Sequence, residues 1–438
     1  MKVKELCNLA AKYVVSYRRR YLFLFSALVL GFCIISVIGS LKDGMADAIY
    51  YSAQNHYSGD IIIAGFEKEL SADHHIYAET LPLIRQKIAE SGVNPDREIL
   101  RTMQTNADNT IYYNGNAVPL KYVAGVDWAA ETDYFNSLNF TEGSPSPDFD
   151  DSTILISAPV AAYIGAHTGD MVLLETETLH GQKNTAFFTI GGIVDDRSLF
   201  GYYKSFVSRR ALNAVIGFAA DDCSTVGLLF NKRAGLEAKR KKLQSLLEAD
   251  IPMRPLVYDR DGFADQQDWD WTGVMFFLLT VSVYVSEVTQ ILQALNIIAY
   301  FLYVMMLLII LVSAGVTYRL ILHERTKEIG TMRAVGFYEK DIRRVLLVES
   351  FTLATLSLVT GFCLTLFVNW IISRLSFSWF PSFEIFLKNG RLLALYSPLA
   401  VALNVAAIYV ILAVAVYVPS FRLSRAPLPE MLSGAHKV

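Results

Sequence analysis

The chain has 438 residues, of which 53% are apolar and 18% charged, and its formal net charge is -3. Because charged residues make up about a quarter of a typical soluble domain, this composition indicates a membrane protein. Residues 42–270 hold 20 Lys and Arg against 33 Asp and Glu, whereas the rest of the chain holds 19 against 9. An acidic middle with basic, apolar flanks argues against a nucleic-acid-binding protein, which would carry a basic face.

The amino-terminal segment, residues 1–20, has apolar residues at helical spacing with lysines among them. This pattern predicts a cytoplasmic amphipathic helix that lies on the anionic inner surface of a membrane, at its edge. A simple soluble helix leading into the first span is the alternative.

Residues 21–41 form the first predicted transmembrane helix, because they contain no charged residue and about 20 helical residues cross a bilayer. Three arginines precede this run, as in a signal peptide. The run is longer than a signal-peptide core, and no small-residue cleavage site follows it. The segment is therefore predicted to remain as a membrane anchor.

Residues 42–270 are predicted to fold into a large α+β domain outside the membrane. Runs rich in Ile, Val and Phe predict strands at 60–64, 153–157, 170–175, 187–194 and 225–230. Amphipathic patterns predict helices at 81–91 and 236–249. The turn-rich stretch 143–151 is interpreted as a hinge between two lobes, and His74-His75 as part of a solvated loop.

Catalytic and metal-binding patterns are missing from the sequence. It contains no G-x-S-x-G, no H-E-x-x-H and no phosphate-binding G-x-x-x-x-G-K-[ST] motif. No Cys pair or His/Cys cluster has metal-ligand spacing. The chain is therefore predicted to be a non-catalytic subunit that has no cofactor of its own and does not hydrolyse ATP alone.

The carboxy-terminal part contains the other predicted transmembrane helices, at 288–318, 345–374 and 392–418, with a short outer loop at 375–391. Residues 1–20, 319–344 and 419–438 carry six, seven and three Lys and Arg. The positive-inside rule then places these segments and both termini in the cytoplasm and the acidic domain outside. A fifth span would move 319–344 outside, so the apolar stretch 271–287 is interpreted as a helical stalk or interfacial helix.

The inner loop 319–344 has Ile329, Met332 and Val335 at three-residue spacing on one face. The charged pairs Glu324/Lys327 and Arg325/Glu328 have i,i+3 spacing. Such a short charged helix with an apolar stripe could transmit force to a cytosolic partner. An ordinary basic loop that obeys the positive-inside rule fits the periodicity equally well.

The same loop carries a family resemblance. Residues 324–336, E-R-T-K-E-I-G-T-M-R-A-V-G, closely resemble the inner-loop signature of the FtsX/MacB/LolC-LolE permeases, the membrane subunits of type VII ABC systems. Residues 418–432 resemble the closing P-x-x-R-x-x-R-x-x-P-x-E-x-L tail of that family. The segments before and after the first span also resemble those of the family, and they occur in the same order. The outer domain resembles the family's outer domain only loosely.

The resemblance implies a permease that moves substrate without a central pore, while a separate cytosolic ABC ATPase dimer binds ATP and Mg and grips the inner-loop coupling helix. It implies that the helix seats in a groove of the ATPase, and that its glycines allow close packing or end the helix. The residues implicated are Glu324, Arg325, Glu328, Ile329, Gly330, Arg333 and Gly336.

The resemblance implies three functions, of which release of lipoproteins from the cytoplasmic (inner) membrane is preferred. Acyl chains would then enter between the first two spans of opposed protomers, in a homodimer or a heterodimer with a paralogue. Candidate lining residues are Phe32, Ile35, Ile298 and Leu302. The alternatives are MacB-like efflux or peptide export with a periplasmic adaptor, and FtsX-like mechanotransmission to a cell-wall hydrolase.

Glu349 lies inside the third predicted span, where a carboxylate is costly in lipid. Either it faces protein or the aqueous edge, or its side chain extends to the membrane surface.

Overall fold

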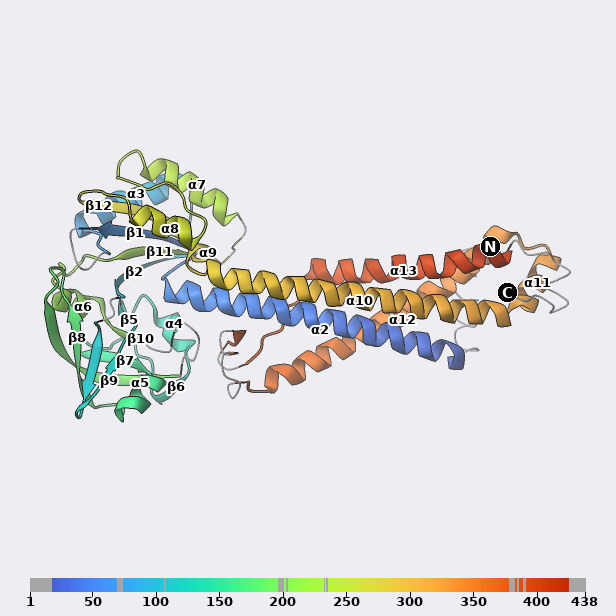
Figure 1. The fold of residues 1–438 in the computed structure, drawn as a ribbon, viewed down its shortest axis with the longest axis horizontal. Helices are drawn as coiled ribbons and strands as arrows, with labels where there is room; N and C mark the ends of the chain where they lie inside the picture. The colour runs from blue at the N-terminus through green and yellow to red at the C-terminus, as the bar shows by residue number, and fades with distance from the viewer. Residues whose placement is uncertain are drawn as a thin grey trace. The chain divides into compact units, whose positions relative to one another are not determined.

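In the computed structural model, the chain forms two compact units (Figure 1). The membrane unit comprises residues 1–45, 293–376 and 392–438, and the inserted unit comprises residues 46–292 and 377–391. The structure describes residues 18–68, 74–105, 108–195, 201, 204–231, 233, 235–377, 383, 386–388 and 391–424. The predicted membrane-edge helix up to residue 17 and the tail from residue 425 lie outside the described residues.

The membrane unit is built from long helices, of which four in the described part of the chain are long and apolar enough to cross a membrane. These are α2 (Arg18–His56), α10 (Ser286–Glu324), α12 (Glu339–Arg374) and α13 (Pro398–Ser424). The predicted fold class, four transmembrane helices with a large domain between the first and second, is confirmed. The helices run beyond the apolar windows, since a charged residue ends an uncharged run without ending a helix.

Helix α2 is the most buried of the four, with 44% of its apolar window covered against 11% for α10, 33% for α12 and 22% for α13. Glycines allow its neighbours to approach. A Cβ on Gly361 of α12 would lie 3.1 Å from Phe32 of α2, and one on Gly31 would lie 2.7 Å from Ile310 of α10. Small residues at helix contacts are typical of membrane bundles. The core around α2 therefore joins all four helices.

Polar contacts join the helices at the end of α2 that leads into the inserted unit. The Asn369 amide on α12 donates to Ser40 Oγ at 2.8 Å and to the Tyr396 hydroxyl at 2.7 Å. The Leu395 N–H donates to the Ser40 carbonyl at 2.9 Å. The segment before α13 is thereby held against α2.

The inserted unit contains one mixed sheet with the order β12-β1-β11-β2-β5-β10-β7-β9-β8-β3-β4, and β6 pairs with β9. Its strands are β1 (Ile61–Glu67), β2 (Arg97–Gln104), β3 (Thr110–Tyr113), β4 (Asn116–Pro119), β5 (Tyr122–Val126), β6 (Phe140–Gly143), β7 (Thr153–Ser157), β8 (Met171–Glu177), β9 (Lys183–Val194), β10 (Lys204–Ser208), β11 (Thr225–Leu229) and β12 (Val274–Thr280). The helices of this unit are η1 (Ala78–Thr80), α3 (Leu81–Ser91), α4 (Thr132–Asn136), α5 (Ala158–Ile164), α6 (Arg209–Ile216), α7 (Leu236–Leu247), α8 (Arg260–Gln267) and α9 (Val281–Tyr284).

The sheet has two halves with separate hydrophobic cores. One half packs β12, β1 and β11 against α3 and α7 on one face. The other half packs β5, β10, β7 and β9 with α5 and α6. The predicted hinge at 143–151 is wrong, because this stretch joins β6 to β7 within the second half. The chain enters that half after β2 and leaves it before β11.

The predicted helical stalk at 271–287 is also wrong. Val274–Thr280 is strand β12, which pairs antiparallel with β1 from Ile61↔Thr280 to Glu67↔Val274. Phe276 and Leu278 pack into the core on one face of the sheet, and Phe277 and Leu279 into the core on the other. Burial on both faces produces a continuous apolar run, which periodicity cannot distinguish from a buried helix.

A buried ion pair in the inserted unit holds the carboxyl end of α2. Arg101 on β2 pairs with Glu131, and both side chains are fully buried. Arg101 Nη1 also donates to the carbonyl oxygens of Asn55 at 2.5 Å and His56 at 3.1 Å. The last carbonyls of a helix have no partner within it, and this guanidinium supplies one.

The prediction that His74-His75 is solvated is wrong for His75. Its side chain is 3% exposed, and its Nε2 lies 2.9 Å from Asp222 Oδ2. The ring stacks on Phe218, with the ring centroids 4.1 Å apart. The flanking polar sequence hides this burial, because the partners come from a distant segment.

Candidate functional site

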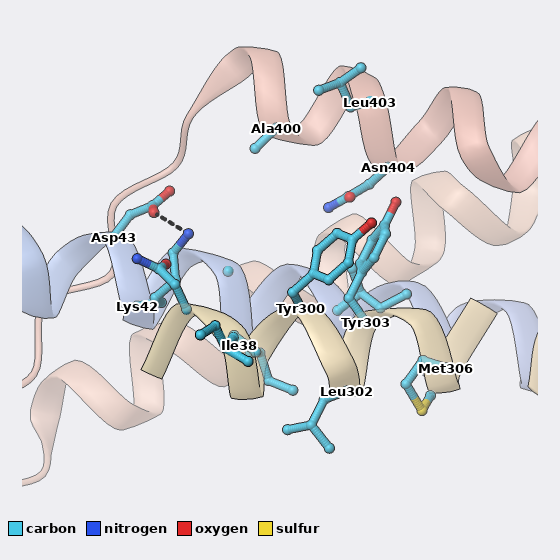
Figure 2. Close-up of a pocket in the computed structure, with 15 residues that line it drawn as sticks. Ile38, Lys42, Asp43, Tyr300, Leu302, Tyr303, Met306, Ala400, Leu403 and Asn404 are labelled. Atoms are coloured by element: carbon cyan, nitrogen blue, oxygen red, sulfur yellow. Dashed lines mark ion pairs between the residues drawn. The ribbon is translucent and has the colours of Figure 1, made fainter. Parts of the chain in front are cut away.

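A groove of about 630 Å³ lies in the membrane unit between α2, α10 and α13 (Figure 2). Its walls are mainly apolar, and it lies toward the ends of these helices that lead into or return from the inserted unit. The lining residues are Ile35, Ile38, Gly39, Lys42, Asp43, Asn296, Ile297, Ala299, Tyr300, Leu302, Tyr303, Met306, Ala400, Leu403 and Asn404.

The structure places two of the four predicted lining residues at this groove. Ile35 of α2 and Leu302 of α10 line it. Phe32 is instead buried in the bundle core, next to Gly361. Ile298 is 56% exposed and is not among the lining residues. Whether a side chain faces the groove depends on the rotation of its helix about the helix axis. An apolar run without polar residues does not reveal this rotation.

Sequence analysis missed the contribution of α13 to the groove. Ala400, Leu403 and Asn404 come from this helix. One signal was present: Asn404 interrupts an otherwise apolar run, and polar residues within spans usually face protein or a cavity.

Polar groups are confined to a few places in the groove. Lys42 Nζ lies 3.1 Å from Asp43 Oδ1, and both side chains are about one-third exposed (Figure 2). On the facing walls, the hydroxyl ends of Tyr300 and Tyr303 point toward Asn404 (Figure 2). A cavity of this size with apolar walls and a few placed polar groups is typical of a ligand-binding site.

A second candidate region is the connection between α10 and α12. It contains α11 (Thr326–Ala334), and Gly336 follows with a φ of 102°. This positive φ favours glycine, and it lets the chain turn before α12 begins at Glu339. The short charged helix predicted here is present.

The predicted coupling residues fall into two groups in this region. Glu324 and Gly336 are exposed, and Glu328 and Arg333 are partly exposed. Arg325, Ile329 and Gly330 are instead buried by this chain's own residues. Contact of any of them with an ATPase stays a prediction.

The buried group centres on an ion pair. Arg325 Nη1 lies 2.9 Å and 3.1 Å from the two carboxylate oxygens of Glu349 on α12. The Tyr21 hydroxyl of α2 donates to Glu349 Oε1 at 2.5 Å. Glu349 is 1% exposed, so of the two alternatives for this residue the structure supports the one in which it faces protein.

This network joins the short helix to the bundle. Arg325 Nε also donates to Glu328 Oε2 at 3.1 Å, on the first turn of α11. Ile329 packs into the core formed by α2, α10, α12 and α13. A displacement of α11 would therefore disturb contacts of α12 directly, and those of α2 through Glu349.

Comparison with known proteins gives one family match, which covers part of the chain. Residues 300–428 match the family model described as FtsX-like permease C-terminal. No relative was found among curated proteins. Among solved structures, the periplasmic region of MacB from Actinobacillus actinomycetemcomitans matches with 10% identity and a TM-score of 0.30, over 54% of this chain and 95% of that chain. A likeness at this level carries no argument about function.

The family match covers α11, α12, α13 and the larger part of α10. These helices hold the buried ion pair of Arg325 and Glu349 and seven of the fifteen residues that line the groove. On this match, the carboxy-terminal part of the chain is similar to the FtsX-like permeases, and the four candidate spans in the described residues make the chain a multi-pass membrane protein.

Proposed function

We propose that the chain is the membrane subunit of a type VII ABC system that releases lipoproteins from the outer leaflet of the cytoplasmic membrane. A separate cytosolic ATPase dimer supplies the energy and binds ATP and Mg. A second permease protomer, identical or a paralogue, completes the assembly. Both termini are cytoplasmic, and the acidic inserted unit lies outside.

The observation that carries this proposal is the groove between α2, α10 and α13. Its apolar walls suit acyl chains, because burying each methylene of a chain contributes about 0.8 kcal/mol. Tyr300, Leu302 and Leu403 are among its partly or largely exposed lining residues. A groove of this kind supports entry of a lipid-attached substrate from the side, in preference to passage of a soluble solute.

The connection between α10 and α12 supports the coupling part of the proposal. Its solvent-facing residues, including Val335 at 76% exposure and Tyr338 at 78%, provide a surface for a cytosolic partner. Among its inward-facing residues, Arg325 pairs with Glu349 of α12, which in turn accepts a hydrogen bond from Tyr21 of α2, and Ile329 packs into the bundle core. ATP-driven movement at α11 would thus reach the helices that form the groove.

The test is a release assay with the permease, its ATPase and a radiolabelled lipoprotein in proteoliposomes. Leu302→Trp narrows the groove, so we expect release to fall at least about tenfold, equivalent to about 1.4 kcal/mol. Leu308→Trp changes an exposed residue of the same helix that is not among the lining residues, and it should leave release unchanged.

Other outcomes would favour the alternatives. If the wild-type assembly releases no lipoprotein but exports a soluble peptide when a periplasmic adaptor is added, the function is MacB-like. If it moves neither substrate but activates a cell-wall hydrolase, the function is FtsX-like.

A further inference from the structure

Asn404 is an amide inside a transmembrane helix, and its side chain lines the groove. It is partly buried, and no hydrogen bond within the described part of the chain involves its amide group. A second asparagine in the bundle, Asn369, does have hydrogen-bond partners. The buried amide of Asn369 on α12 donates to both Ser40 and Tyr396.

An amide without a partner is costly in a groove with apolar walls. Transfer of such a group from water into an apolar environment costs several kcal/mol when no hydrogen bond replaces its water. Polar residues within spans therefore usually face a partner or a substrate path. Asn404 faces the groove, so the group that satisfies it is expected to enter with the occupant.

The position of Asn404 along α13 constrains the chemistry of that group. It lies about 9 Å from Pro398, the first residue of the helix, at 1.5 Å per residue. In Figure 2, Asn404 lies between the charged pair Lys42–Asp43 and Met306, which all line the groove. In acylated molecules, ester or amide carbonyls likewise join the acyl chains to the polar part.

We infer that Asn404 is the specificity-determining residue of the groove, and that its amide hydrogen-bonds the ester or amide carbonyl that links an acyl chain to its headgroup. The Asn404 N–H donates to the carbonyl oxygen, and the facing Tyr300 and Tyr303 hydroxyls can donate to the same linkage (Figure 2). The inference rests on the proposed function only in that an acyl chain occupies the groove.

The shared chemistry, a carbonyl at the base of an acyl chain, occurs both in membrane phospholipids and in the acylated amino terminus of a lipoprotein. The experiment uses full-length permease in nanodiscs and photoactivatable probes of both sources. One pair is a diester phospholipid and its diether analogue, which lacks the carbonyls. The other pair is an acylated lipopeptide and its ether-linked analogue.

We expect the wild type to label with the carbonyl-containing member of at least one pair about tenfold more than with its ether analogue, the effect of one hydrogen bond in a dry site. Asn404→Leu should remove this preference and leave labelling by the ether probes unchanged. Leu403→Ala, a lining change without a polar group, should lower labelling by both members equally.

The results separate failure of the inference from failure of the proposed function. Labelling that is strong at Leu302 and Leu403 but equal for ester and ether probes overturns the inference and leaves the groove as an acyl site. Absence of labelling at these positions overturns acyl occupancy of the groove, and the inference with it. If Asn404→Leu instead converts a dimer to a monomer with the probe preference intact, Asn404 belongs to a protomer interface and the inference is wrong.

Discussion

At the scale of single residues, the ion pair between Arg325 and Glu349 lies inside the chain, although the motif around Arg325 predicts a surface for a partner. Both side chains are at most 3% exposed, so Arg325 is directed into the chain. Breaking a buried pair by removing one partner costs about 3–5 kcal/mol, because the other charge is left buried alone. Replacing both partners with apolar residues of similar volume is often neutral for stability.

This contrast predicts the behaviour of three variants. Glu349→Leu and Arg325→Met should each lower the melting temperature of the detergent-solubilised chain, whereas the double variant should recover most of the loss. The double variant should still bind the ATPase, yet release less lipoprotein per ATP hydrolysed, because α11 has lost its polar connection to α12. The measurements are thermal unfolding, co-purification, and the ratio of release to hydrolysis.

Two results would contradict this interpretation. If both single variants are as stable as wild type, the pair is not buried as described. If the double variant is stable and fully coupled, the pair serves folding alone.

The stripe of Ile329, Met332 and Val335 shows a limit of reasoning from sequence at the same scale. Three-residue steps turn a helix by 300°, so each step rotates the side chain by about 60° and the three residues span about 120°. Ile329 is consequently buried at 3% exposure, whereas Val335 is 76% exposed. The sequence predicts the short helix and its apolar stripe. Which residues of the stripe are buried depends on how the helix packs against the bundle core.

At the scale of elements, the close contacts of α2 with its neighbours depend on glycines. A Cβ on Gly44 would lie 1.8 Å from the Leu393 carbonyl oxygen, which is backbone and cannot rotate away. Gly315 in α10 has nothing within 4 Å of such a Cβ. The same substitution at the two positions therefore has opposite expected effects.

We predict that Gly44→Ala destabilises the chain by about 1–3 kcal/mol, the usual cost of overpacking. Gly315→Ala should be neutral or stabilising by up to about 1 kcal/mol, because alanine favours the helix. Thermal unfolding in one detergent compares both with wild type. Equal effects of the two changes would show that α2 does not approach the Leu393 segment as described.

Strand β12 shows why the elements could be predicted only in part. The spans could be predicted because a run of about 20 uncharged, apolar residues is typical of a transmembrane helix and rare elsewhere. The run containing β12 was misassigned, because its pairing partner β1 lies about 200 residues earlier in the chain. Of the four lining residues predicted from the first two spans, Ile35 and Leu302 lie at the groove. The place of α13 beside them depends on tertiary packing, and occupancy of the groove by substrate stays a prediction.

At the scale of the whole molecule, the charge distribution predicts the orientation of the chain. The acidic inserted unit is expected outside, and the basic connection between α10 and α12 inside. A single cysteine at position 388, introduced as Lys388→Cys into a cysteine-free background, should react with an impermeant maleimide from outside intact cells. Tyr258→Cys, at an exposed position of the inserted unit, should react from the same side.

Thr331→Cys provides the opposite control, since this exposed residue of α11 should react only after the membrane is opened. Labelling of position 388 from the cytosolic side alone would exclude the proposed topology.

The buried Arg325–Glu349 pair also has a consequence for biogenesis. Glu349 lies near the start of the predicted span 345–374, and an isolated acidic residue opposes insertion of a span, by up to about 2.5–3.5 kcal/mol at its centre. Arg325, whose charge neutralises that of Glu349, lies just after the end of α10. Only α11, the turn at Gly336 and the first part of α12 separate the two residues along the chain. Leaving the translocon as a paired hairpin would neutralise both charges before either meets lipid. The order in which the ribosome delivers these helices thus becomes part of how the chain reaches its native state.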